Sequence, residues 1–548
     1  MREQLKSLSR ETIIYGASTV IGRFLNFLLV PFYVNVLRNA SEYGISTSLY
    51  TYLSFFNILF TLGLEAAYFR YASKGEKEQR SQSEERALFS TPFWVVFIVG
   101  VTFAILILAC SRLLVYPAFH DPRGNIAPMV PMLTRIIRYG AFIVLLDSLA
   151  VIPFAVLRIE QKAKFFAFLK LLNIVVTLAL NFLFILGFHW GVEGIFLANL
   201  GASLLVVLML VPTVLKRLEL KIRRHILDKM LPFGLTNVPA NLGAMMVQVI
   251  DRPIVQTYLG LAMLGIYQAN YRMGFIMMVF VSLFEYAWRP FFLRQAKTDD
   301  ARARIIFSRV FTYFMLIALM SFLALSFFLP YLLTTPVLHR QLLKQQYQVG
   351  MRIIPVVLLA YIFQGAYTNF IAGIYVKERN RVLPFITLLG ALVNIVANLI
   401  LVPRQGLIGG IMGAALATLF AYIAMALTLY WQSQKVYPVA YDWPRIMTLV
   451  TIVGVTFSIE RAVTLTQLLN GYLPLLMLRS SLLLVAVTAL FVTNFFSAGE
   501  REVLLGLVGR RRVRPPDDDP TPPTGDDVRR SVAAAEEPVE KAKERLEG

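Results

Sequence analysis

Apolar stretches long enough to cross a membrane recur along almost the whole chain. A transmembrane helix needs about 20 consecutive apolar residues, and about fourteen such stretches lie between Glu11 and Phe496. Hydrophobic residues make up 57% of the 548 residues and charged residues only 16%, which is far too apolar for a soluble protein. The sequence therefore predicts an all-α polytopic membrane protein with about fourteen transmembrane helices. The expected spans are 12–37, 43–64, 87–111, 135–157, 165–187, 191–214, 232–258, 263–288, 306–330, 352–375, 382–402, 406–431, 446–465 and 472–495.

Lysine and arginine residues accumulate in alternate loops. The segments 74–86, 216–229 and 510–514 are rich in them, whereas the loops on the opposite side are poorer. Because cytoplasmic loops carry the excess of cations, both termini are expected in the cytoplasm. The net charge of +20 then reflects this topology and contact with lipid headgroups rather than binding of nucleic acid.

Some short motifs occur twice in the chain. Asn181 and the run 191–194 resemble Asn398 and the run 406–409. Transporters often place their substrate path between two such repeats, although chance similarity of apolar segments is the alternative. The expected layout is a six-helix bundle at 1–214, a second at 215–435, two additional helices at 436–496, and a cytoplasmic disordered tail at 497–548.

Polar side chains recur at helical spacing inside several spans. In the span 43–64, for example, Tyr50 and Asn57 lie on one face. Such faces avoid lipid, so together they are expected to line a hydrated path. The alternative for each residue is structural hydrogen bonding between helices. The candidate sugar-binding residues are Tyr50, Asn57, Asn241, Gln248, Tyr271 and Gln364.

Charged residues also lie inside the spans. Arg23 falls near the middle of the first span, where an arginine costs about 2.5 to 3.5 kcal/mol and needs a partner or a wet cavity. An anion-binding site and a structural ion pair are the two interpretations. The acidic candidates for coupling or for ion pairing are Asp147, Asp251 and Glu285.

Catalytic signatures are scarce. The sequence contains neither a nucleotide-binding P-loop nor an HExxH motif. The expected outer loop 112–134 contains Asp121 as its only carboxylate. Cys110 is the only cysteine, which excludes an intramolecular disulfide and a multi-cysteine metal cluster. We therefore expect a protein that is not an enzyme and has no cofactor.

The segment 249–272 contains Val-Ile-Asp-Arg-Pro, Leu-Gly-Ile-Tyr and the pair Tyr271-Arg272. It resembles the seventh and eighth helices of polysaccharide flippases in the multidrug/oligosaccharidyl-lipid/polysaccharide exporter superfamily. Asn394, Asn398 and the run 406–413 are similar to helices eleven and twelve of the same family. The resemblance covers the layout of residues 8–495 and leaves out the tail.

The resemblance implies a V-shaped pair of six-helix bundles, which exposes a cationic cavity alternately to each side of the membrane. Arg23 and Arg272 match, by position, the arginines proposed to hold the substrate pyrophosphate. Sodium ligands are implied at Asp251, Asn394 and Thr418, so coupling to sodium or to protons is expected.

The expected function is to flip a polyprenyl-pyrophosphate-linked oligosaccharide from the cytoplasmic to the outer leaflet. Such a step belongs to biosynthesis of an O-antigen or lipopolysaccharide type of polymer, with polysaccharide assembly proteins as partners. A lipid II flippase and a drug/cation antiporter of the same fold are the alternatives. The antiporter should prefer an acidic lumen, which Arg23 and Arg272 disfavour.

Overall fold

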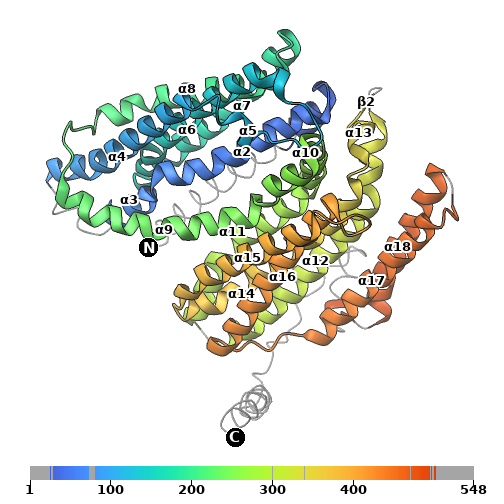
Figure 1. The fold of residues 1–548 in the computed structure, drawn as a ribbon. Helices are drawn as coiled ribbons and strands as arrows, with labels where there is room; N and C mark the ends of the chain where they lie inside the picture. The colour runs from blue at the N-terminus through green and yellow to red at the C-terminus, as the bar shows by residue number, and fades with distance from the viewer. Residues whose placement is uncertain are drawn as a thin grey trace, which may run out of the picture. The chain divides into compact units, whose positions relative to one another are not determined.

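The computed structural model describes residues 22, 25, 27, 29–72, 81–298, 300–337, 340–469, 471–493, 495–496 and 499–501. Within these residues the chain is almost entirely helical (Figure 1). The strands of the described part, β1 (Pro336–Val337) and β2 (Arg340–Gln341), form one short antiparallel hairpin. Helices satisfy their backbone hydrogen bonds internally, as lipid requires. The prediction of an all-α multi-pass membrane protein is confirmed.

Most helix boundaries follow the predicted apolar spans to within several residues, because the apolar runs end where the helices end. The span predicted at 135–157, for example, corresponds to α6 (Val130–Ile159). The spans predicted at 232–258 and 263–288 are the exceptions, since the chain breaks inside both of them, at residue 250 and at residues 272–274. The other long helices are α2 (Ala40–Thr61), α4 (Gln82–Ala109), α7 (Ala163–Asn181), α8 (Gly191–Leu215), α9 (Arg224–Val249), α10 (Asp251–Tyr271), α11 (Phe275–Thr298), α12 (Asp300–Thr334), α14 (Ile354–Val376), α15 (Leu383–Leu401), α16 (Gly410–Val436), α17 (Trp443–Leu465) and α18 (Tyr472–Val492).

The number of membrane spans is lower among the described residues than the sequence predicts. Eleven helices there are long and apolar enough to cross a membrane, or twelve if α2 and the short α3 (Leu64–Ala72) form one bent span. One of the eleven is the continuous stretch Arg224–Ala296, which contains two predicted spans. The first predicted span, 12–37, falls largely outside the described residues. Fourteen spans therefore stay a prediction.

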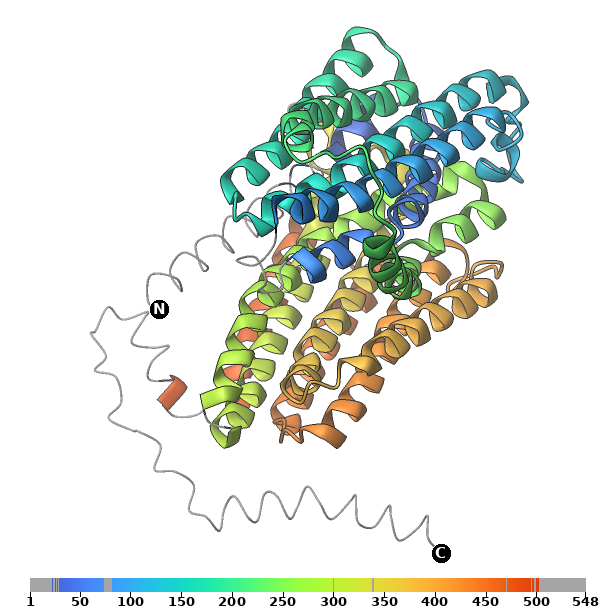
Figure 2. The same ribbon diagram turned by 90° about the vertical axis from the view of Figure 1, so that its left-hand side faces the viewer.

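The chain divides into two compact units. Unit 1 comprises Met1–Leu283, Leu333–Tyr361 and Arg381–Met425, and unit 2 comprises Phe284–Leu332, Ile362–Asn380 and Ala426–Gly548. In unit 1, the helices α4, α6, α7 and α8 lie side by side, as both views show (Figure 1, Figure 2). The domain boundaries predicted at 214 and 435 remain predictions.

Two backbone breaks shape the helices of unit 1. Leu62 and Gly63 have φ angles of 50° and 66°, and α2 and α3 meet there at 42°. Gly260 has a φ of 85° and separates two helical parts of α10. The chain folds back at this glycine, since Asp251 before it and Tyr267 after it are joined by a hydrogen bond. Glycine suits such left-handed positions because it lacks a Cβ.

A local arrangement occurs twice in unit 1. Asn181 is fully buried at the end of α7, and Asn398 is fully buried near the end of α15. In each case the next long helix begins at a glycine with positive φ, Gly191 at 54° and Gly410 at 60°. Between Asn181 and Gly191 the chain also forms a π-helix, η3 (Phe182–Gly187). Gly406, the glycine that the sequence pairs with Gly191, also has a positive φ, of 91°, and precedes the start of α16.

In unit 2 the helices α17 and α18 are joined by a buried ion pair. The Arg479 guanidinium donates from Nε to Glu460 Oε1 at 2.7 Å, and the two side chains are only 10% and 3% exposed. Tyr331 of α12 lies under the same guanidinium, with its ring centroid 4.8 Å away. A buried charge of this kind is tolerated because its partner compensates it.

Candidate functional site

A chain of hydrogen bonds crosses three helices of unit 1. Asn199 of α8 donates from Nδ2 to the Tyr50 hydroxyl of α2 at 3.0 Å. One helical turn further along α8, the Ser203 hydroxyl donates to Asp147 Oδ1 of α6 at 2.7 Å and lies 3.3 Å from Asn199 Oδ1. The predicted residues Tyr50 and Asp147 are thus connected through two residues that the sequence analysis did not single out. Asn199 and Ser203 are polar residues four positions apart in an apolar span, so they lie on one face of the helix. This spacing could have identified them from the sequence.

Asp147 is one of the acidic candidates for ion pairing, and Arg23 lies outside the described residues. The cation that interacts electrostatically with Asp147 in the described part of the chain is Lys170 of α7. The Lys170 ammonium lies 4.3 Å from the centroid of the Phe154 ring. This lysine extends along aromatic side chains, as long cationic residues do in membranes.

Asp251 begins α10 and is 1% exposed. Its Oδ2 accepts a hydrogen bond from the Tyr267 hydroxyl, and Thr418 of α16 also hydrogen-bonds to Tyr267. Asp251 Oδ1 is buried and has no hydrogen-bond partner among the described residues. The structure therefore gathers two of the three predicted sodium ligands, Asp251 and Thr418, around one tyrosine.

Asn394, the third predicted sodium ligand, has other partners. Its Nδ2 donates to the Val247 carbonyl of α9 at 3.0 Å, and its Oδ1 accepts from Asn398 Nδ2 at 2.5 Å. The group formed by Asp251, Tyr267 and Thr418 offers carboxylate and hydroxyl oxygens, which are hard ligands suited to an alkali cation or to a proton. Within the described residues, no group of three or more His, Cys, Asp or Glu residues could hold a metal ion.

Arg272 is exposed at the start of η4 (Arg272–Gly274), directly after α10. It is close enough to Tyr33, Tyr43 and Tyr50 to interact with them electrostatically. Tyr271 is 6% exposed and packs edge to face against Tyr361, with ring centroids 6.2 Å apart. A cationic group and several phenols from distant segments of unit 1 therefore share one region.

The remaining predicted site residues fall in several places. Asn57 is half-buried two turns after Tyr50 on the same helix, and Asn241 and Gln248 are exposed on α9. Gln364 lies in unit 2, where its Oε1 is buried without a hydrogen-bond partner in the described part of the chain. Glu285 pairs with Arg289 at 2.6 Å, one turn along α11. The structure does not test ligand binding by any of these residues.

Glycines bring the backbones together at both ends of α2. At its start, a Cβ on Gly44 would lie 1.9 Å from the Leu261 carbonyl oxygen, and one on Gly265 would lie 2.0 Å from the Ala40 carbonyl oxygen. We name this the Gly44 contact. At the other end, a Cβ on Gly234 would lie 2.6 Å from the Leu62 carbonyl oxygen. We name this the Gly63 contact, because Gly63 lies against Gly234.

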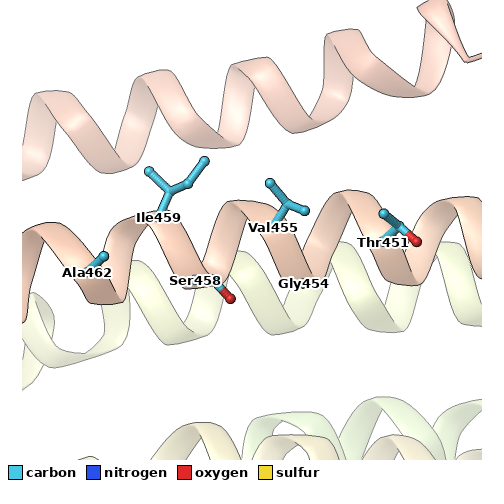
Figure 3. A pocket seen from close by; sticks show the side chains of 6 residues that line it. All are labelled: Thr451, Gly454, Val455, Ser458, Ile459 and Ala462. Carbon is cyan, nitrogen blue, oxygen red and sulfur yellow. The ribbon is translucent and has the colours of Figure 1, made fainter.

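An open groove of about 540 Å³ follows α17 in unit 2. Figure 3 shows its six lining residues on this one helix: Thr451, Gly454, Val455, Ser458, Ile459 and Ala462. None of them is charged, so this groove is unsuited to bind the phosphates of a substrate and is suited to an apolar chain.

The sequence profile of a family described as polysaccharide biosynthesis protein matches residues 37–345, more than half of the chain. The chain belongs to this family. The matched part of this polysaccharide biosynthesis protein contains Tyr50, Asp147, Asp251 and Arg272. Arg23 and the residues Gln364, Asn394 and Thr418 lie outside it. No curated protein matches the chain in a sequence search.

Several solved structures have a fold similar to that of this chain. The lipid II flippase MurJ, in an inward closed conformation, has a TM-score of 0.67 at 15% identity, covering 88% of this chain and 99% of MurJ. An inward-facing MATE multidrug transporter of the MOP superfamily has a TM-score of 0.59 at 13% identity, covering 77% of this chain and 94% of its own. A MOP superfamily transporter from Pyrococcus furiosus has a TM-score of 0.52 at 16% identity, covering 78% of this chain and 95% of its own. These similarities establish the fold.

Proposed function

We propose that this protein flips a polyprenyl-pyrophosphate-linked oligosaccharide across a bacterial inner membrane, in O-antigen or lipopolysaccharide assembly. The supporting observation is Arg272, an exposed arginine that interacts electrostatically with Tyr33, Tyr43 and Tyr50 within a multi-pass polysaccharide biosynthesis protein. Guanidinium groups bind phosphate oxygens in bidentate fashion, and phenols hydrogen-bond with sugar hydroxyls. Arg272, with Arg23, attracts the pyrophosphate, while Tyr50 and its neighbours contact the sugars.

The membrane potential favours this direction of transport. A lipid pyrophosphate with about two negative charges gains roughly 4 to 5 kcal/mol when it moves outward across about 100 mV, inside negative. The membrane potential alone is therefore sufficient to favour outward transport of the lipid pyrophosphate, and an ion gradient adds to this driving force.

Alternating access uses the two ends of α2. In the proposed orientation the Gly44 contact closes the outer side and the Gly63 contact closes the cytoplasmic side. Each contact joins backbones directly, so opening requires separation of whole helices rather than a side-chain movement. The polyprenyl chain is apolar and stays in lipid during this movement.

Lipid II is the alternative substrate, favoured by the fold similarity to MurJ. It carries the same class of polyprenyl pyrophosphate, so Arg272 serves both headgroups equally. A deletion strain separates the two substrates: loss of the protein traps either lipid-linked oligosaccharide or lipid II on the cytoplasmic leaflet. An unchanged distribution of both lipids together with drug sensitivity would favour the antiporter.

The test of the substrate site uses complementation of that strain. Arg23→Ala and Arg272→Ala each reduce export of the lipid-linked oligosaccharide about tenfold or more, because a hydrogen bond to a charged group contributes roughly 1.5 to 3 kcal/mol. Arg135→Ala is the control, since Arg135 is half-exposed and pairs with Glu193. Wild-type export by both of the first two variants, at normal protein levels, contradicts the site assignment.

A second prediction concerns Asp251 as the site of coupling. Asp251→Asn keeps an acceptor for Tyr267 but removes the negative charge that would bind sodium or a proton. Stimulation of transport by the coupling gradient, roughly 5- to 150-fold for a typical coupling free energy, falls to about one, while potential-driven transport persists. Proteoliposomes with separately imposed sodium, proton and electrical gradients measure this effect. Asp300→Asn, at an exposed ion pair with Arg304, is the control. Unaltered gradient dependence in Asp251→Asn excludes this coupling site.

A further inference from the structure

Arg252 is a cation whose hydrogen-bonding capacity is incompletely used. It follows Asp251 in α10 and is half-buried, and its Nε is buried without a hydrogen-bond partner among the described residues. The adjacent Asp251 carboxylate interacts electrostatically with Arg252, while its Oδ2 accepts a hydrogen bond from the Tyr267 hydroxyl. Unpaired buried donors are costly and rare in folded proteins.

Arg252 lies in the same region as Arg272. Its guanidinium carbon is 6.0 Å from the centroid of the Tyr271 ring. Both arginines are close enough to Tyr43 and Tyr361 to interact with them electrostatically. The two cations therefore share two neighbours in unit 1, Tyr43 on α2 and Tyr361 on α14.

The chain reversal at Gly260 sets the relative heights of the two arginines. Arg252 precedes Gly260 by 8 residues and Arg272 follows it by 12 residues. At about 1.5 Å per helical residue, this difference of 4 residues places Arg272 roughly 6 Å further from the turn. Such a separation lets each guanidinium contact a different one of two linked phosphates, or the same phosphate at successive positions.

We propose that Arg252 is a second anion-binding residue, which together with Arg272 selects a lipid diphosphate over a lipid monophosphate. The inference rests on the proposed function and specifies its substrate class. A planar guanidinium presents parallel N–H donors to two phosphate oxygens, so one arginine serves each phosphate. The Tyr271 ring holds the Arg252 guanidinium without using its donors. A monophosphate occupies only one of the two arginines.

A different role for Arg252 would be to balance the charge of Asp251. The two roles predict different behaviour of a variant in which both charges are removed. If Arg252 serves only as a counter-charge, Asp251→Asn together with Arg252→Gln restores binding that Arg252→Gln alone loses. If Arg252 binds phosphate, the double variant stays as defective as Arg252→Gln.

The experiment measures binding of undecaprenyl diphosphate and undecaprenyl monophosphate to the full-length protein in lipid nanodiscs. Arg252→Gln is expected to weaken diphosphate binding by about tenfold or more and monophosphate binding by less than about twofold. Arg252→Lys keeps the charge but loses the bidentate geometry, and is expected to fall between the two. Arg135→Gln, in an exposed ion pair, serves as the matched control.

Four outcomes overturn the inference. Equal weakening for both lipids indicates a structural role, as does recovery in the double variant. Unchanged diphosphate binding by Arg252→Gln, with a defect in Arg272→Ala, rejects the role of Arg252 alone and leaves the proposed function standing. Absence of diphosphate binding by the wild-type protein rejects both.

Discussion

Gly44→Ala is expected to abolish most transport at a normal protein level. A Cβ at this position would lie 1.9 Å from the Leu261 carbonyl oxygen, and a backbone atom cannot rotate away as a side chain can. Overpacking of this kind costs about 1 to 3 kcal/mol. The population closed at the Gly44 contact then falls by roughly 5- to 150-fold. The measurement is export of lipid-linked oligosaccharide in the complemented deletion strain.

Gly44→Ala is also expected to increase access to α2 from one side of the membrane only. In a Cys110→Ser background, Asn57→Cys reports access to α2 from either side through an impermeant maleimide. Gly44→Ala is expected to increase labelling from outside, and Gly234→Ala from the cytoplasm, where its Cβ meets the Leu62 carbonyl oxygen at 2.6 Å. Gly243→Ala is the matched control on α9, because a Cβ there meets nothing within 4 Å. Identical labelling patterns in Gly44→Ala and Gly234→Ala refute this model of gating.

Arg479→Met is expected to destabilise the hairpin of α17 and α18 by about 3 to 5 kcal/mol, because it leaves the charge of Glu460 buried and unpaired. Glu460 is 3% exposed, and Arg479 is its ion-pair partner across the two helices. The loss also removes the cation–π contact with Tyr331 of α12. Hydrogen exchange localises the effect, since amides of α17 and α18 should exchange faster than those of α12.

Removal of both charges is the decisive comparison for this pair. Glu460→Met combined with Arg479→Met leaves no buried charge and is expected to recover most of the lost stability. Arg461→Met is the control, because Arg461 is the next residue on α17 and contacts Phe457 rather than Glu460. If the double variant is as unstable as Arg479→Met, packing of the arginine side chain, and not charge, stabilises the hairpin.

Individual residues of the candidate site could be predicted from the sequence only where the residue itself is unusual in its span. Tyr50, Asp147 and Asp251 stand out because polar side chains are rare inside apolar spans. Arg252 was not selected as a ligand from the sequence. The structure joins Asp251 to Tyr267 by a hydrogen bond and brings the Arg252 guanidinium to the Tyr271 ring. Both tyrosines follow the chain reversal at Gly260, which the sequence did not reveal.

The sequence by itself determined the class of the fold and most helix boundaries, because the thickness of the membrane and the need for internal backbone hydrogen bonds act on each span separately. Only the tertiary structure decided which spans touch. Gly44 lies against Leu261 and Arg272 beside Tyr50 through contacts between segments far apart in the chain. Helix periodicity orients a side chain on its own helix, whereas these contacts depend on how two helices cross and how closely their backbones approach.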